Sequence, residues 1–109
     1  MALKLMALGA NLIADDRTIV TISEAGLRAS CPKEILGQIE ARGVGLLTAE
    51  SQPSAIVRLV VDLGKQEQDR LPPRRDITLI GQNIALLHTP VHDHFLEAIL
   101  QYLKGGRSA

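Results

Sequence analysis

The sequence predicts an α/β or α+β domain with a mostly aliphatic core. Segments rich in β-branched residues and bounded by glycine or polar residues outnumber segments with the apolar spacing of a helix. Hydrophobic residues make up 46% of the 109 residues, yet only Phe95 and Tyr102 are aromatic. Aliphatic side chains must therefore fill the core. A chain of this length forms at most one domain and can bury about two thirds of its unfolded surface.

The first thirty residues predict one helix followed by short strands. Residues 1–8 are good helix formers, and Gly9 can terminate the helix. Three short β-branched or apolar segments follow, each predicted to be a strand: 11–14, 18–23 and 27–30. Two adjacent carboxylates, Asp15 and Asp16, fall in the turn between the first two of these strands.

A second helix is predicted to follow, from Pro32 to about Ala41. Proline suits the first turn of a helix, and Gly43 would stop it. Three apolar residues of this segment have the spacing of a core-facing stripe: Ile35, Leu36 and Ile39.

The second half of the chain predicts strands, a hairpin and a final helix. Strands are expected over 43–49 and 55–63, and the second is nearly all apolar, as in a strand covered on both faces. The charged, proline-containing segment 65–76 reads as a loop, and 76–90 as a hairpin that turns near Gly81. The last helix should open at His92 or Asp93 and end at two glycines, with one apolar side: Leu96, Ile99, Leu100 and Leu103.

Charge and cysteine content exclude several functional classes. Twelve basic residues balance twelve acidic ones, so no cationic footprint for nucleic acid or anionic lipid is expected. Two aromatic residues give single-stranded bases almost no stacking platform. Cys31 is the only cysteine, which excludes an intramolecular disulfide and favours a reducing, cytoplasmic compartment. We expect neither a membrane span nor a signal peptide.

Two short motifs could carry chemistry, and each has an ordinary structural interpretation. The adjacent carboxylates Asp15 and Asp16 fit a solvated turn, or a site for a metal or a transferred proton. In "EARGVG", Glu40 could hold a metal and Arg42 could bind a phosphate, while the glycines let backbone amides approach an anion. The same residues also fit the end of a helix that is capped by glycine.

Two further segments have the same ambiguity. Arg70 in "QDRLPPRR" is by itself an ordinary loop residue, as are Arg74 and Arg75. The stretch "HTPVHDHF" offers three histidines and an aspartate to a divalent metal, or simply an exposed helix entrance. The 109 residues contain no Gly-x-x-x-x-Gly-Lys-Ser/Thr phosphate loop.

Five segments, taken in order, resemble the C-terminal catalytic domain of HPr kinase/phosphorylase. They are "ALKLMALGANLIADDR", "IEARGVGLL", "VVDL", "DRLP" and "ITLIGQNIALLHTP". The likeness covers nearly the whole chain and is strongest toward the short forms of α-proteobacteria. It implies a P-loop kinase-like, PEP carboxykinase-like α/β fold, with a mixed sheet, flanking helices and the phosphate-loop strand expected to be absent before Ala2.

The resemblance also implies an activity and a set of site residues. Members of that family phosphorylate a serine of the phosphocarrier HPr with ATP and Mg²⁺, and many reverse the reaction. By resemblance Asp16 is the acid/base, Asp15 its neighbour, Glu40 the magnesium ligand and Arg70 an active-site arginine. Arg42 falls within the catalytic signature.

The expected partner is HPr or a paralogous phosphocarrier, and the family tends to form hexamers. One departure concerns the reverse reaction, because the family's Pro-Val-x-x-Gly-Arg loop reads "PVHDHF" here, without its glycine and arginine. Two rival functions stay open from the residues alone: a non-catalytic binding or regulatory module, and a small metal-binding protein that uses the histidines.

Overall fold

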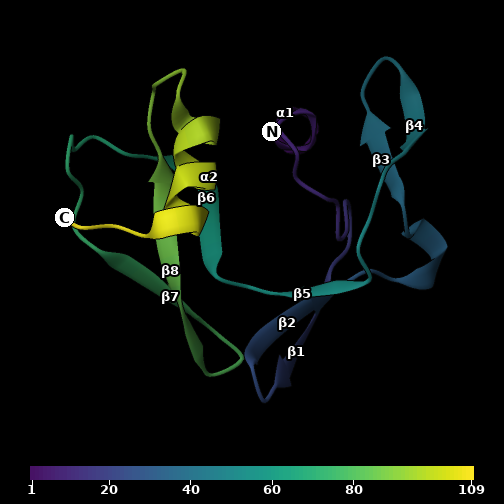
Figure 1. Ribbon diagram of the computed structural model, residues 1–109, viewed down its shortest axis with the longest axis horizontal. Helices are drawn as coiled ribbons and strands as arrows, with labels where there is room; N and C mark the ends of the chain where they lie inside the picture. The colour runs from purple at the N-terminus through teal and green to yellow at the C-terminus, as the bar shows by residue number, and fades with distance from the viewer. The chain divides into compact units, whose positions relative to one another are not determined.

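The computed structural model describes all 109 residues, which fold as two compact units, Met1–Val57 and Arg58–Ala109 (Figure 1). The resemblance implied a mixed sheet; the strands form three sheets, of which the one in the second unit is mixed. The first unit contains α1 (Ala2–Ala7), β1 (Ile19–Ser23), β2 (Gly26–Ser30), the short 3₁₀ helix η1 (Lys33–Ile35), β3 (Gln38–Ala41), β4 (Gly45–Thr48) and β5 (Ser54–Ile56). The second contains β6 (Leu59–Gln66), β7 (Arg75–Leu79), β8 (Gln82–Thr89) and α2 (Phe95–Gly105).

The antiparallel sheet of the first unit has the order β1-β2-β5. Strands β1 and β2 confirm the predictions for 18–23 and 27–30. They form a hairpin in which the Ser23 hydroxyl donates to the Gly26 carbonyl at 2.8 Å. The central strand carries Leu27, whose exposed fraction is 1%. Leu27 is thus the most completely buried side chain of this unit.

The helix predicted over 32–41 is wrong beyond its first turn. Only η1 is helical, and Gly37 then takes a φ of +73°, which ends the helical path. The following strand β3 alternates exposed and buried residues, with Ile39 and Ala41 buried, and it pairs with β4. A period of two has replaced the expected helical period, so Ile35, Leu36 and Ile39 do not share one side.

The segment 11–14 is not a regular strand either. Leu12 forms a single parallel bridge to Ser51, with its N–H donating to the Glu50 carbonyl at 3.1 Å and its own carbonyl accepting from Gln52 at 2.9 Å. Its side chain is buried. One anchored residue thus takes the place of the predicted strand, immediately before the two aspartates.

The second unit is built on a mixed sheet of order β6-β8-β7. Strand β8 pairs in parallel with β6 and antiparallel with β7. The single strand predicted over 55–63 is in fact two, β5 and β6, which belong to different units. The last four residues of β6 are exposed, so this strand is not covered on both faces along its length.

The hairpin and the final helix of this unit confirm the sequence prediction. Strands β7 and β8 pair from Arg75–Leu86 to Leu79–Gln82, and α2 begins at Phe95, slightly later than expected. Figure 1 shows α2 running in front of the strands of this sheet. Phe95 and Ile99 are its buried residues, whereas Leu103 is exposed. No helix in the structure has the length and apolar character needed to cross a membrane.

The tight turn between β7 and β8 holds an unfavourable residue. Its two central residues, Ile80 and Gly81, have φ of +49° and +78°. Turns of this kind favour Asn-Gly, because a β-branched side chain is strained at positive φ. We expect Ile80→Asn to raise the free energy of unfolding by about 1 kcal/mol, measured by denaturant titration. Gly81→Ala is the control and should destabilise; an Ile80→Asn variant no more stable than wild type would contradict the prediction.

Candidate functional site

The outer edge of strand β3 receives the first aspartate of the doublet. The Glu40 backbone N–H donates to Asp15 Oδ2 at 2.9 Å, across 25 positions of sequence. Because β4 pairs with the other edge of β3, this amide would otherwise need water as its partner. The hydrogen bond fixes the Asp15 carboxylate beside the strand that carries Glu40.

A cavity of about 240 Å³ opens at this contact. The alternation of β3 puts Gln38 and Glu40 on its exposed side, and pairing places Leu46 of β4 opposite Glu40. The lining residues are Asp15, Asp16, Ile35, Gln38, Glu40 and Leu46. The structure thus brings together three of the sequence-predicted site residues, Asp15, Asp16 and Glu40, around one cavity.

The two aspartates differ in what they are free to do. Asp15 is held by the Glu40 amide, while the Asp16 side chain makes no hydrogen bond within the protein. Upstream, the bridge from Leu12 to the 50–52 segment fixes the chain three residues before Asp15. Asp15 is therefore the oriented carboxylate, and Asp16 is the one available to a ligand.

The donor set of this cavity suits a hard cation only in part. Carboxylate oxygens from Glu40 and the aspartates are ligands that Mg²⁺ prefers, and Mg²⁺ commonly takes just one or two carboxylates, with water and phosphate completing its shell. No group of three acidic, histidine or cysteine side chains is arranged to hold a metal by itself. These carboxylate oxygens are compatible with a magnesium ion whose shell is completed by water and phosphate.

Arg42 does not share this cavity with the carboxylates. It sits at the exposed tip of the β3–β4 hairpin, in a turn closed by the Val44 N–H donating to the Ala41 carbonyl at 2.9 Å. It is not among the residues lining the cavity. The expected glycine-capped helix end is in fact this turn, with Gly43 at a φ of +83°.

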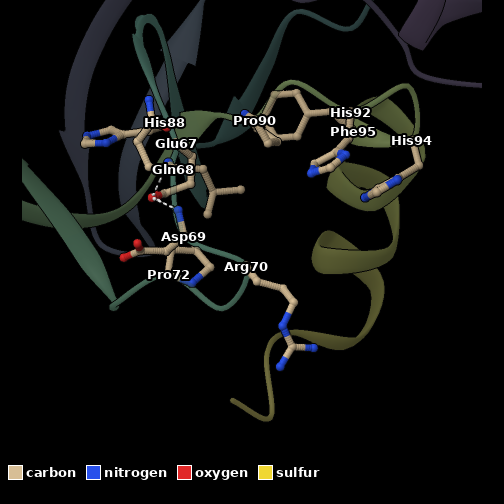
Figure 2. Close-up of a pocket in the computed structure, with 11 residues that line it drawn as sticks. Glu67, Gln68, Asp69, Arg70, Pro72, His88, Pro90, His92, His94 and Phe95 are labelled. Carbon is tan, nitrogen blue, oxygen red and sulfur yellow. Dashed lines mark hydrogen bonds between the residues drawn. The ribbon is translucent and has the colours of Figure 1, made fainter.

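Arg70 lines a second cavity, of about 610 Å³, within the second unit. Its walls come from the loop between β6 and β7, the end of β8 and the start of α2 (Figure 2). His92 and His94 stack with ring centroids 5.2 Å apart and planes 14° from parallel. Parallel rings do not direct their nitrogen lone pairs at one point, and no three-residue metal-binding group exists here. The histidine-rich segment does not form a metal centre in this structure.

Glu67 is a residue of this cavity that sequence reasoning missed. Its carboxylate accepts hydrogen bonds from the Arg75 guanidinium at 3.4 and 3.2 Å, and from the backbone N–H groups of Gln68 and Asp69 at 3.1 and 3.3 Å. The hydrogen bond from Arg75 lowers the pKa of Glu67, against the opposing effect of desolvation, and the two amides add to the lowering. One glutamate and one arginine in a charged loop gave no sequence signal for this pair.

Comparison with known proteins establishes the fold. No protein-family model matches the sequence, and no curated protein does. The structure of the HPr(Ser) kinase/phosphatase from Coxiella burnetii matches 94% of this chain and 72% of its own chain, with a TM-score of 0.81 and 23% sequence identity. The chain therefore has the HPr kinase-like fold, and the resemblance inferred from its sequence is confirmed for the fold.

The two aspartates should respond differently to removal of their side chains. Asp15→Ala deletes the acceptor of the Glu40 amide and should lower the free energy of unfolding by about 1 kcal/mol. Asp16→Ala removes no hydrogen bond within the protein and should stay within about 0.5 kcal/mol of wild type. Chemical denaturation of both variants tests this; equal losses would contradict the assignment of Asp15 as the held carboxylate.

The Glu67–Arg75 pair should make stability depend on pH. Because the folded pKa of Glu67 lies below its ordinary value of 4.5, the pair stabilises the fold above that value and is lost as the pH falls through the folded pKa. Wild type should melt at a higher temperature than Glu67→Gln at pH 7, and the gap should close on acidification. Glu24→Gln, in an exposed turn, is the control. A gap that does not change with pH would disprove this role.

Proposed function

We propose that this chain belongs to an HPr kinase/phosphorylase-like protein of the P-loop kinase-like class. It would carry the proton acceptor and a magnesium ligand for transfer of a phosphoryl group from ATP to a serine of HPr or a paralogous phosphocarrier. The observation that carries the proposal is the 2.9 Å hydrogen bond between Asp15 and the Glu40 amide. It gathers the three predicted carboxylates in a chain with the HPr kinase-like fold.

The hydrogen-bond pattern supports Asp16 rather than Asp15 as the proposed base. A general base must have an oxygen free to accept a proton at hydrogen-bond distance. One carboxylate oxygen of Asp15 accepts a hydrogen bond from the Glu40 amide, whereas the Asp16 side chain makes no hydrogen bond within the protein and lines the same cavity. In the proposed step Asp16 takes the serine hydroxyl proton as the serine oxygen bonds to phosphorus and the bond from phosphorus to the ADP oxygen breaks.

Two other residues of the chain would position the phosphoryl group and help to neutralise its charge. Glu40 would bind Mg²⁺, which when present supplies neutralisation of developing phosphate charge. Arg70 would contact the transferring phosphoryl oxygens, since a guanidinium fork matches phosphate geometry. No residue lining the carboxylate cavity is a cation, so the positive charge that phosphoryl transfer needs must come from elsewhere than these six side chains.

The test supplies a phosphate-binding segment to this chain. A strand and a Gly-x-x-x-x-Gly-Lys-Ser loop fused ahead of Ala2 should yield Mg²⁺-dependent phosphorylation of a serine on HPr or its paralogue. Asp16→Asn should lower the rate constant about 10²- to 10⁴-fold, because an amide cannot accept the serine proton. Radiolabelled phosphate transfer measures the rate. Reverse transfer should stay poor, because "PVHDHF" lacks an arginine.

Two controls make this experiment decisive. Asp76→Asn, an exposed strand residue outside both cavities, should leave transfer unchanged. The unfused 109-residue chain should bind ATP·Mg²⁺ weakly in calorimetry, since its sequence has no phosphate loop. A fusion that folds and binds nucleotide but transfers no phosphate would support the binding-module alternative, and activity surviving Asp16→Asn would remove the assigned base.

A further inference from the structure

The loop between β6 and β7 carries Arg70 without any regular secondary structure. Residues 67–74 contribute no strand pairing, and Arg70 itself is exposed. A long side chain on such a loop populates many conformations, and ordering it costs conformational entropy. For Arg70 to act at a defined point, other contacts must hold the backbone that carries it.

Glu67 holds the loop before Arg70. Its carboxylate folds back over the next two residues and accepts both of their backbone N–H groups, as well as the guanidinium of Arg75 on β7. Its own N–H donates to the Thr89 carbonyl at the end of β8, at 2.9 Å. The Glu67 side chain is only 8% exposed. One residue thus ties the start of the loop to both neighbouring strands.

A second anchor holds the loop after Arg70. Arg107, which follows α2, donates from Nη2 to the Pro72 carbonyl at 2.7 Å. In return, Arg74 Nη2 donates to the Arg107 carbonyl at 3.3 Å. Arg70 therefore lies three residues after one anchor and two residues before the other. In Figure 2 its guanidinium extends away from Glu67 and from the two stacked histidines.

We propose that Glu67 and Arg107 are positioning residues that hold the Arg70 loop from its two sides. The isolated value of an exposed ion pair is small, but here one carboxylate serves a guanidinium and two loop amides at once. The hydrogen bonds to the two loop amides, and not the ion pair alone, restrain the backbone of the loop. The catalytic part of this inference rests on the proposed role of Arg70, whereas the restraint itself does not.

Trypsin reports the restraint directly, because it cleaves after Arg70 only when the loop opens. In the 109-residue chain, Glu67→Ala and Arg107→Gln should each speed this cleavage about tenfold. Cleavage after Arg42, at the exposed hairpin tip of the other unit, is the internal reference. Glu67→Gln should restore part of the protection, because its amide oxygen can still accept from the two loop N–H groups. Glu24→Gln is the matched control and should match wild type.

The fusion described above tests whether the restraint acts through Arg70. Glu67→Ala should lower kcat about tenfold or more with little change in KM for ATP, and it should cause no further loss in an Arg70→Ala background. An additive loss would show a merely structural role, and unchanged cleavage after Arg70 in Glu67→Ala would overturn the restraint. If the wild-type fusion is inactive, the proposed function fails while the trypsin result still decides the restraint.

Discussion

The first unit's candidate site depends on one hydrogen bond, from the Glu40 amide to the Asp15 carboxylate. A two-stranded hairpin leaves outward-facing amides on each edge, and these need partners. Asp15 supplies one, which draws the acidic doublet against β3. Since side chains alternate along the strand, the residue that donates this amide also projects its carboxylate onto the exposed face. The hydrogen bond that satisfies the β3 amide is therefore the same one that brings the acidic doublet to Glu40.

Both candidate sites are held by carboxylates that bind backbone amides. In the first unit Asp15 binds a strand edge, and in the second Glu67 binds two loop amides and the guanidinium of Arg75. Such hydrogen bonds order segments that are not paired in a sheet. They leave the side chains of neighbouring residues without hydrogen bonds to the protein. Asp16 and Arg70 are those neighbours, and neither side chain makes a hydrogen bond within the protein.

Sequence patterns within a segment correctly predicted the elements whose structure depends mainly on that segment. The β1–β2 and β7–β8 hairpins and the final helix each combine the right period with a turn or glycine signal, and all three were found. The segment 32–41 failed because the positions of Ile35, Leu36 and Ile39 also fit a helix, and only Gly37 signalled otherwise. The convergence of Asp15 and Glu40 came from family resemblance. The Glu67–Arg75 pair had no signal, since a charged loop does not show which charges meet.

The proposed function makes the two directions of phosphoryl transfer unequal for a physical reason. Phosphorylation needs a proton acceptor and a magnesium ligand, and the first unit presents both carboxylates in one cavity. The resemblance associates dephosphorylation with the Pro-Val-x-x-Gly-Arg loop, whose place falls here in the second unit. Counted from Pro90 and Val91, the glycine position of that loop carries His94 and its arginine position carries Phe95, a buried side chain. A phenyl ring has neither the fixed charge nor the paired donors of a guanidinium, so the forward direction is the one that these residues favour.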